Sequence, residues 1–441
     1  MSRSNQKSRP KLEADVDITN LSHDGRGVAR IGEKIVFVIG ALPGERARIR
    51  VVRPHRHFDE AEVVELLSRS PDRIEPRCPH FGTCGGCALQ HLSSEKQIES
   101  KQQVLAENFI RIGKVEPREW LPPLTDQPWG YRRKGRLSVK WVDKKEKALV
   151  GFRENDSRFV ADLRECHTLL PEVGLRIAEI AELIGSLDAK REIAQIEIAA
   201  GDETVALVFR NLVPLTDPDR ECLIAFGQRS NLAILLQSGG PDSVEPLWPD
   251  AINLSFRLPE HNLDIAFRPL DFVQVNAGMN RKMLARTLDL LDPQPNDSVL
   301  DLFCGLGNFT LPIARRAGSV IGVEGESNLV QRAADNAARN GLSNLEFVAA
   351  DLFADQRGSD WAQRNFDKLL LDPPRSGAAQ VLEYLPRKSV KRVVYVSCHP
   401  ASLARDAGTL VNEHGFRLTA AGVMDMFPQT AHVESIAVFE R

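Results

Sequence analysis

The sequence predicts an α/β domain in the C-terminal part of the chain, a small all-β domain at its start and an α+β region between them. From Asp297 onward, short runs of β-branched residues alternate with helical patterns, which is typical of a parallel sheet covered by helices. Residues 7–68 are instead short apolar runs separated by glycines, which indicates strands alone. Three cysteines within ten residues mark the region between these two parts.

The composition narrows the class of protein. With 441 residues, of which 42% are hydrophobic and 27% charged, the chain can form several packed cores. The first fifteen residues are polar, and no apolar run approaches the roughly 20 residues that a membrane-spanning helix needs. We therefore expect a cytosolic protein, whose seven cysteines are metal-binding, catalytic or inert rather than paired in disulfides.

The all-β segment, residues 7–68, carries a strongly basic strand. Residues 46–51 alternate between arginine and apolar side chains, so that three guanidinium groups share one strand face. A face of this kind predicts contacts with the phosphates of RNA, whereas the plainer interpretation is a solvated strand face. The segment resembles a TRAM domain, a small OB-like barrel attached to RNA-modifying enzymes.

The cysteines that follow are spaced as metal ligands. Cys78, Cys84 and Cys87 are close in sequence, and Gly85 and Gly86 allow the backbone to fold tightly between them. Three thiolates need a fourth ligand, for which the candidates are His80, His91 and Cys166. The spacing predicts a metal site but leaves both an iron–sulfur cluster and a zinc ion open.

Two further segments precede the α/β domain. Residues 93–111 predict a helix whose apolar stripe includes Ile98, Leu105, Phe109 and Ile112. Prolines then mark a linker.

Residues 129–152 contain eight Lys and Arg residues against two acids, interleaved with Trp129, Tyr131 and Trp141. Cations with aromatic side chains predict a surface for single-stranded RNA, and a charged hairpin with core aromatics is the alternative. We expect no chemistry in residues 172–265, where Cys222 is interpreted as a core residue.

The C-terminal part has the pattern of a cofactor site. A predicted strand over residues 298–303 leads into a glycine turn and then a helix, and the next strand ends in Glu324, where a carboxylate is placed for ribose hydroxyls. The turn is shorter than a dinucleotide fingerprint and begins at Asp301, a form used by S-adenosylmethionine (SAM) methyltransferases. Later strands end at Asp351, Asp372 and Cys398. Five such strand ends in order predict a Rossmann-like SAM methyltransferase.

Cys398 narrows the kinds of methyl-transfer reaction that we expect. Carbon 5 of uracil is a poor nucleophile, but addition of a thiolate to carbon 6 turns the ring into an enolate that can attack a methyl donor. A base must then remove the proton from carbon 5. Residues 432–435, His-Val-Glu-Ser, lie in the last predicted strand region and offer Glu434 for this purpose.

These motifs together give a specific family resemblance. FVQVN at residues 272–276, DLFCGLGNFT, GVEG, DPPR, SCHP and HVES resemble the RNA 5-methyluridine methyltransferases, in particular the bacterial branch that carries a TRAM domain and acts on 23S ribosomal RNA. The resemblance implies Cys398 as nucleophile and Glu434 as base. It implies a 4Fe-4S cluster on Cys78, Cys84, Cys87 and Cys166. It implies SAM-site positions at Gln274, Phe303, Asn308, Glu324, Asp351 and Asp372.

The resemblance also has implications for domains and partners. It assigns residues 69–92 and 120–265 to a central α+β iron–sulfur domain, and residues 93–119 and 266–441 to the methyltransferase domain. It implies a monomer that acts on 23S rRNA before the ribosome is fully assembled, without binding DNA. His399 and Asp351 both stand where relatives more often have Asn. A tRNA target, an RNA exocyclic-amine methyltransferase and a non-catalytic RNA-binding factor are the competing hypotheses.

Overall fold

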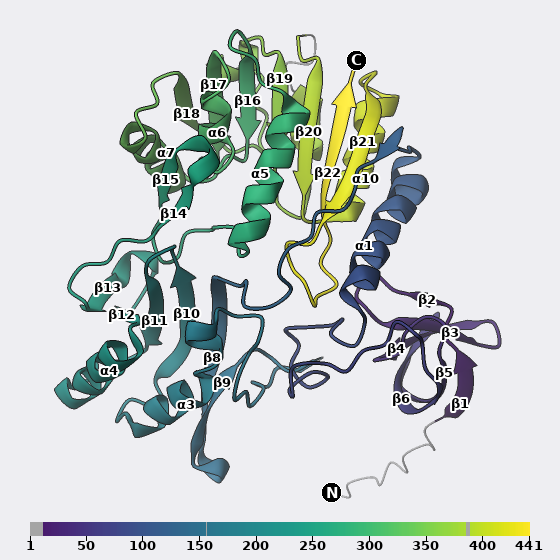
Figure 1. Ribbon diagram of the computed structural model, residues 1–441, viewed down its shortest axis with the longest axis vertical. Coiled ribbons are helices and arrows are strands. Elements are labelled where there is room, and N and C mark those ends of the chain that lie inside the picture. The colour runs from purple at the N-terminus through teal and green to yellow at the C-terminus, as the bar shows by residue number, and fades with distance from the viewer. Residues whose placement is uncertain (1–11, 156, 385–388) are drawn as a thin grey trace, which may run out of the picture.

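Three large β-sheets and one two-stranded sheet organise the described residues (Figure 1). The computed structural model describes residues 12–155, 157–384 and 389–441, so residues 7–11 of the expected β domain lie outside the described residues. The first sheet forms the N-terminal domain, the second the middle of the molecule and the third the C-terminal α/β domain. Within the described ranges, no helix is both long and apolar enough to cross a membrane.

The N-terminal domain is a curled six-stranded sheet in the order β1-β5-β6-β4-β3-β2. The strands are β1 (Glu13–Asp17), β2 (Asn20–Leu21), β3 (Gly27–Ile31), β4 (Lys34–Ile39), β5 (Arg46–Pro54) and β6 (Phe58–Ser68). Alternate residues of β5, including Ala47 and Ile49, are buried in a small apolar core with Val16, Val36 and Val38. The all-β prediction for this segment is confirmed.

The arginine face of β5 differs from the prediction, because neighbouring strands neutralise it. Arg48 contacts Asp15 on β1 and Glu65 on β6, at 3.0 and 2.8 Å. Arg50 likewise contacts Glu13 and Glu62, at 2.9 and 3.4 Å. The face that is purely basic along the strand is therefore mixed in the sheet, and the expected one-sided charge is wrong for these arginines.

The central sheet has the order β13-β12-β11-β10-β8-β9. Its strands are β8 (Lys134–Val142), β9 (Lys147–Gly151), β10 (Ile193–Ala200), β11 (Val205–Asn211), β12 (Ala233–Gln237) and β13 (Val244–Trp248). The helices of this region are α2 (Pro171–Gly174), α3 (Ile177–Ser186) and α4 (Asp217–Ser230). Cys222 is exposed on α4, which corrects its interpretation as a core residue, because it falls on the outward face of that helix. Tyr131 is buried and donates to the carbonyl of Pro428 at 2.9 Å, so it is not a free stacking platform.

The third sheet has eight strands in the order β18-β17-β16-β19-β20-β22-β21-β7. They are β7 (Glu119–Trp120), β16 (Ser298–Leu302), β17 (Ser319–Glu324), β18 (Leu345–Ala349), β19 (Lys368–Leu371), β20 (Arg392–Ser397), β21 (Arg417–Met424) and β22 (Glu434–Glu440). The first five strands of that order are parallel, and β22 runs antiparallel between β20 and β21. A hairpin of β14 (Ser255–Leu258) and β15 (Leu263–Ala266) precedes this sheet in the chain.

Helices cover this sheet on both faces, as a doubly wound fold requires (Figure 1). They are α5 (Ala277–Leu291), α6 (Thr310–Ala314), α7 (Ser327–Arg339), α8 (Asp360–Gln363), α9 (Ala379–Tyr384) and α10 (Pro400–Asn412). Two separate apolar clusters, one on each face, share alternate residues of the strands, for example Val394 on one face and Tyr395 on the other. The predicted Rossmann-like α/β architecture is confirmed.

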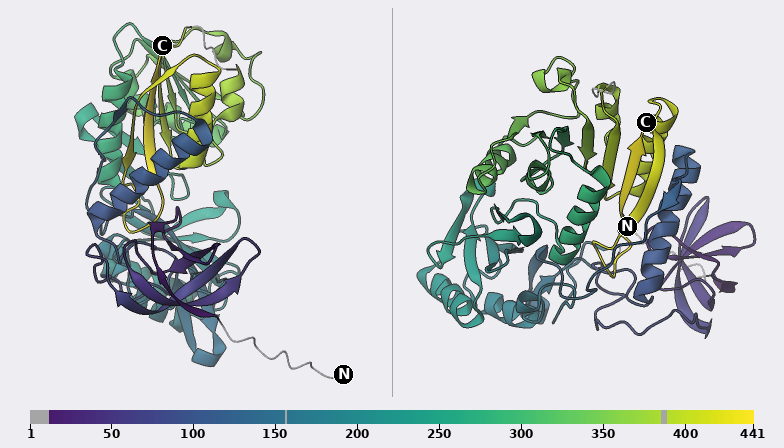
Figure 2. Two further views of the ribbon diagram at one scale, coloured as in Figure 1. Left: turned by 90° about the vertical axis from the view of Figure 1, so that its right-hand side faces the viewer. Right: turned by 45° about the horizontal axis from the view of Figure 1, so that its top comes forward.

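One helix from the first third of the chain packs on the α/β domain. This is α1 (Ser94–Asn108), which contacts α10 and β21 and lies beside the N-terminal barrel in both views of Figure 2. A π-helical turn, Phe109–Gly113, follows it. The wider turn shifts the helical period, so Phe109 is buried while Ile112 is 47% exposed, against the predicted stripe. A Cβ at Gly113 would meet the carbonyl of Ala404 at 2.4 Å, so only glycine permits this close contact with α10.

Candidate active site

The predicted strand-end residues gather at one edge of the third sheet. Asp301 is the penultimate residue of β16, Glu324 ends β17, and Asp372 and Cys398 directly follow β19 and β20. Asp351 comes two residues after β18. Because these five strands are parallel, their carboxyl ends open on the same side, which is the side where open α/β sheets bind ligands.

Asp301 is a buried acid with a free lone pair. Its Oδ2 accepts a hydrogen bond from the Thr310 hydroxyl at 2.5 Å, while its Oδ1 is buried and has no partner among the described residues. Burial raises the pKa of Asp301 to about 8, with a further rise from the charges of Asp372 and Glu324. A buried carboxyl group with an unsatisfied oxygen fits a cationic donor such as an amino group.

The loop after β16 is shaped to approach a ligand with its backbone. Phe303, Gly305 and Gly307 all have positive φ, at 67°, 54° and 88°. The Glu324 carboxylate holds the loop, since its Oε2 accepts from the amide of Gly305 at 3.1 Å and its Oε1 accepts from the amide of Gly325 at 2.7 Å. A non-glycine residue with positive φ is strained, so the backbone conformation of Phe303, which the sequence did not reveal, also marks this site.

The remaining predicted cofactor positions lie around this loop. Asn308 exchanges two side-chain hydrogen bonds with Asn280, both 3.0 Å long. Gln274 lines a small cavity together with the same Asn280. The Oδ1 of Asp351 accepts from the amide of Phe353 at 2.9 Å, which leaves the exposed carboxylate at the end of β18. Asn280 was missed in the sequence because nothing local distinguishes an amide on a helix.

Cys398 and Glu434 lie next to each other in the sheet. Ser397 pairs with Ser435 across β20 and β22, so the next residue outward on each strand is Cys398 and Glu434. Glu434 is buried, and burial together with the charge of Asp372 raises its pKa to about 8. Burial and then the charge of Glu434 raise the pKa of Cys398 to about 11. A nucleophile beside a carboxyl group whose pKa lies near neutrality suits a reaction that needs both addition and proton removal.

Two positive or polar neighbours of this pair were not assigned from the sequence. The guanidinium of Arg375 contacts Nδ1 of His432 at 3.4 Å, and its charge lowers the pKa of both Cys398 and Glu434. His399 caps α10, because its Nδ1 accepts from the amide of Ser402 at 3.3 Å. An Asn at that position could cap the helix in the same way, so the departure at His399 keeps the local structure.

The four predicted cluster cysteines line one pocket. Cys78, Cys84, Cys87 and the buried Cys166 surround it, with Phe152 and Leu163 as apolar walls. Burial and then the other thiols raise the pKa of Cys84 to about 11, and burial, with Cys166 the nearest like charge, raises that of Cys87 to about 12. In the described part of the chain no three His, Cys, Asp or Glu side chains are grouped to hold a metal ion.

The two histidines considered as fourth ligands differ in position. His80 lines the cysteine pocket, but its Nε2 accepts from the amide of Arg164 at 3.0 Å. His91 is not among the residues that line the pocket; its ring packs on Phe81, with centroids 5.2 Å apart. The arrangement therefore favours Cys166 over either histidine as the fourth ligand.

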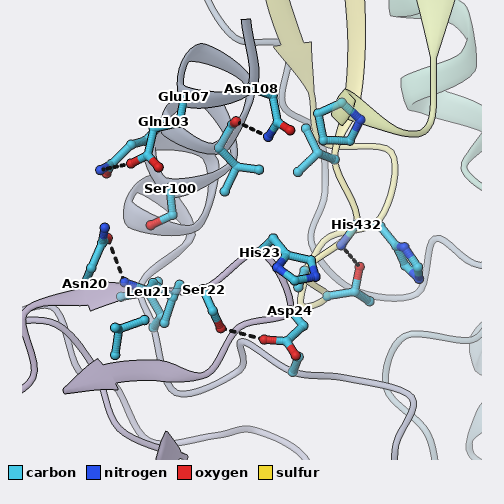
Figure 3. Close-up of a pocket in the computed structure, with 18 of the residues that line it drawn as sticks. Asn20, Leu21, Ser22, His23, Asp24, Ser100, Gln103, Glu107, Asn108 and His432 are labelled. Carbon is cyan, nitrogen blue, oxygen red and sulfur yellow. Dashed lines mark hydrogen bonds between the residues drawn. The ribbon is translucent and has the colours of Figure 1, made fainter. Parts of the chain in front are cut away.

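A large cleft leads to Cys398. Its volume is about 1210 Å³, and the turn after β2, the exposed side of α1 and the loop that contains His432 line it. Figure 3 shows His23 and Asp24 from the N-terminal domain on one wall and Ser100 and Gln103 of α1 on another. The cleft joins the N-terminal domain directly to the edge that carries Cys398.

Comparison with known proteins agrees with this geometry. The family described as tRNA (uracil-5-)-methyltransferase matches residues 249–441, and the TRAM domain family matches residues 12–64. A 23S rRNA (uracil(1939)-C(5))-methyltransferase of Xanthomonas oryzae is 61% identical over 96% of both chains, and one of Stenotrophomonas maltophilia is 58% identical over 99% of both. A tRNA (uracil-54, C5)-methyltransferase of Pyrococcus abyssi, solved with S-adenosyl-L-homocysteine, shares the fold at 24% identity with a TM-score of 0.74, over 96% of this chain and 99% of its own.

The chain therefore belongs to the family of SAM-dependent RNA uracil-5-methyltransferases. The Xanthomonas oryzae and Stenotrophomonas maltophilia relatives, which match it over 96% and 99% of its length, are named RlmD. The predicted TRAM domain, the predicted SAM methyltransferase and the predicted type of reaction are confirmed by these matches.

Proposed function

We propose that this enzyme methylates carbon 5 of uracil 1939 in 23S ribosomal RNA, the target in the names of its full-length relatives. Cys398 is the nucleophile and Glu434 the base. The observation that carries this assignment is the register of β20 and β22, which sets the thiol beside the carboxyl group at the cofactor edge of the sheet. An amine-directed methyltransferase needs no such pair, because an amine already has a lone pair.

The reaction follows from this pair. The thiolate of Cys398 adds to carbon 6, forming a carbon–sulfur bond and moving the double-bond electrons toward O4 as an enolate. Carbon 5 then takes the methyl group, and the sulfonium sulfur of SAM keeps the electron pair of the broken bond. Glu434 removes the proton from carbon 5, the double bond re-forms, and the thiolate of Cys398 leaves.

Methyl donor binding is assigned to the loop after β16 and its surroundings. Asp301 meets the amino group of SAM through its unpartnered Oδ1. Glu324 faces the ribose hydroxyls and Asp351 the adenine edge, as their places at successive strand ends support. Gln274, Phe303, Asn308 and Asp372 complete the set, with Asp372 near the transferred methyl group.

A 4Fe-4S cluster on Cys78, Cys84, Cys87 and Cys166 belongs to the proposal. The four thiols line one pocket with apolar walls, and an all-cysteine set of this kind suits an iron–sulfur cluster. Bound there, the cluster would be held by these four thiolates and would cross-link residues 78–87 to residue 166. We assign these residues to a central domain, residues 69–92 and 120–265.

RNA reaches the site along the cleft between the TRAM domain and α1 (Figure 3). Residues 93–119 act as part of the methyltransferase domain with residues 266–441, a division that the packing of α1 on α10 and β21 supports. The exposed Phe272, with 71% of its surface accessible, offers a ring for base stacking next to Gln274. We further propose that the enzyme works as a cytoplasmic monomer on rRNA that is not yet fully assembled.

One experiment tests the nucleophile and the target together. The enzyme is incubated with SAM and a 23S rRNA fragment that contains 5-fluorouridine at position 1939. Fluorine cannot be removed as a proton, so a covalent protein–RNA adduct should accumulate with the wild type and with Cys222→Ser, but not with Cys398→Ala. Active enzyme that forms no adduct would contradict the mechanism. Methylation of tRNA in place of the rRNA fragment would contradict the target.

A further inference from the structure

A buried ion pair lies close to the proposed base. Lys101 of α1 is 2% exposed and Asp425 is 5% exposed, and their Nζ and Oδ1 atoms are 2.6 Å apart. The same ammonium group donates to the carbonyl of Phe427 at 3.1 Å. Burying an ammonium group is unfavourable unless it is paired, and a hydrophobic pair at such a place often serves stability as well or better. The pair therefore calls for a role other than stability.

Asp425 is the first residue of a loop, and Glu434 directly follows the last residue of the same loop. This loop, residues 425–433, joins β21 to β22 and is the yellow segment that extends beyond the strands in Figure 1. Met424 pairs with Glu434 across the two strands, so Asp425 directly follows the partner of Glu434. Lys101 thus fixes the start of the loop, one position from the residue opposite Glu434.

The tip of the loop is held by the same helix. Gln97, one turn before Lys101 on α1, accepts from the amide of Gln429 at 3.0 Å and donates to its side chain at 3.1 Å. The carbonyl of Gln429 in turn accepts from the amides of Ala88 and Leu89, both at 3.0 Å. α1 therefore holds the loop at both its start and its tip.

We propose that Lys101 is a positioning residue for the reaction: held by Asp425, it fixes the loop that leads to Glu434 and places a buried positive charge beside that base. This role rests on the proposed function of Glu434. It concerns the step in which the proton of carbon 5 passes to the Glu434 carboxylate, the double bond re-forms and the bond from carbon 6 to the sulfur of Cys398 breaks.

The charges around Glu434 explain why such a group is needed. Burial and the charge of Asp372 raise the pKa of Glu434, whereas Arg375 and Lys101 lower it. Cys398 on the neighbouring strand end faces Glu434, and its thiolate, when it forms, adds a further negative charge beside this carboxyl group. Lys101 itself faces Asp425 and Glu434, and His432 lies within its field. Of the two cations that act on Glu434, Arg375 is exposed and able to engage substrate. Lys101 is buried, and although burial lowers its own pKa, the ion pair with Asp425 favours its charged form.

Loss of Lys101 should slow release of the product more than formation of the covalent intermediate. Without the nearby charge, the pKa of Glu434 rises, so less carboxylate is present at neutral pH. We expect Lys101→Gln, whose amide keeps a donor toward Phe427, to accumulate the methylated protein–RNA adduct with ordinary RNA and SAM. The breakdown of that adduct should be about tenfold slower at pH 7 and should recover above pH 9, a shift of about one pH unit.

The controls separate this role from a general loss of structure. Lys101→Arg keeps the charge and should restore most of the breakdown rate. Lys282→Met removes a surface lysine of α5 that pairs with Asp126 and lies outside the cleft, and it should behave as the wild type. Lys101→Met with Asp425→Asn removes both buried charges at once, so it leaves no unpaired charge and should show a smaller pH shift in the same direction even if Lys101→Gln folds poorly.

The outcomes are distinct. The proposal is overturned if Lys101→Gln and the double variant Lys101→Met with Asp425→Asn break down the adduct with the pH dependence of the wild type. It is also overturned if both variants slow the breakdown by the same factor at every pH. Glu434→Gln tests the function on which it rests, since this variant should hold the adduct at all pH values. If Glu434→Gln releases product normally, the assignment of Glu434 as base fails, whatever the Lys101 variants do.

Discussion

The negative charge of Glu434 disfavours ionisation of Cys398: after burial, this carboxylate is the largest cause that raises the pKa of the thiol to about 11. The two groups sit at matching ends of β20 and β22, so this repulsion is built into the register of the sheet. At neutral pH only roughly one thiol in ten thousand of the free enzyme is then ionised. Because the thiolate is the reactive form, we expect it to form only when substrate binds.

Removal of Arg375 should shift the pH dependence of the addition step to higher pH. Its charge lowers the pKa of both Cys398 and Glu434, so both pKa values rise in Arg375→Ala and the reactive thiolate becomes rarer at a given pH. We expect the rate of adduct formation at pH 7.5 to fall about tenfold, and the variant to reach the rate that the wild type has at pH 7.5 only about one pH unit higher. Single-turnover assays across this range measure it. Arg357→Ala, which removes an exposed arginine paired with Asp355, should leave the profile unchanged; an unchanged profile in Arg375→Ala would refute the assignment.

Binding of S-adenosyl-L-homocysteine should release a proton. Burial raises the pKa of Asp301 to about 8, so its carboxyl group is mostly protonated at pH 7 in the free enzyme. A ligand ammonium group at its free Oδ1 favours the ionised form, and the proton passes to the buffer. Titration calorimetry in buffers of different ionisation enthalpy should give close to one released proton at pH 7, and close to none in Asp301→Asn. Equal proton release by both proteins would place the ligand amine elsewhere.

Cluster binding should depend on four cysteines and no others. Anaerobic purification should give a brown protein that absorbs near about 400 nm and carries about four irons. Serine at Cys78, Cys84, Cys87 or Cys166 should lower the iron content strongly, whereas Cys222→Ser should keep it, because Cys222 is exposed on α4. A colourless protein with one zinc ion per chain would show that the pocket holds a different metal.

RNA affinity should respond to the lysines of the central hairpin more than to the paired arginines of the barrel. Lys144 and Lys145 are exposed at the turn between β8 and β9, while Arg48 is held between Asp15 and Glu65. We expect Lys144→Ala with Lys145→Ala to weaken binding of an rRNA fragment and to reduce the salt slope by about 0.7 for each phosphate that is no longer neutralised. Arg48→Ala should change affinity less. Filter binding at several salt concentrations decides between them, and a larger effect of Arg48→Ala would restore the barrel face as the main RNA-binding surface.

Local patterns predicted the α/β domain well because its signals are local. A strand has its period within five or six residues, and the residue that follows it, such as Asp372 or Cys398, is placed by the strand itself. Parallel strands then bring these ends together without further information. Three of the four pocket cysteines could be found for the same reason, since their spacing is equally short-range.

The missed features all depend on residues far apart in the chain or on a break in a regular period. Arg48 meets acids 33 and 17 residues away, so its sequence neighbours could not show that its charge is balanced. Lys101 lies 324 residues before Asp425, and neither stands out by itself. Ile112 was misplaced because a π-helical turn breaks the period of 3.6 residues that the stripe assumed.

The position of β22 has a consequence for how the enzyme folds during its synthesis. This strand follows every other strand of its sheet in the chain, yet it lies in the interior, between β20 and β21. During translation the place between β20 and β21 stays empty until the ribosome has made β22, and the carboxylate that we propose as the base arrives with this strand. A nascent chain that has already exposed Cys398 therefore lacks the group that releases the product, and the site becomes complete only when the last strand pairs.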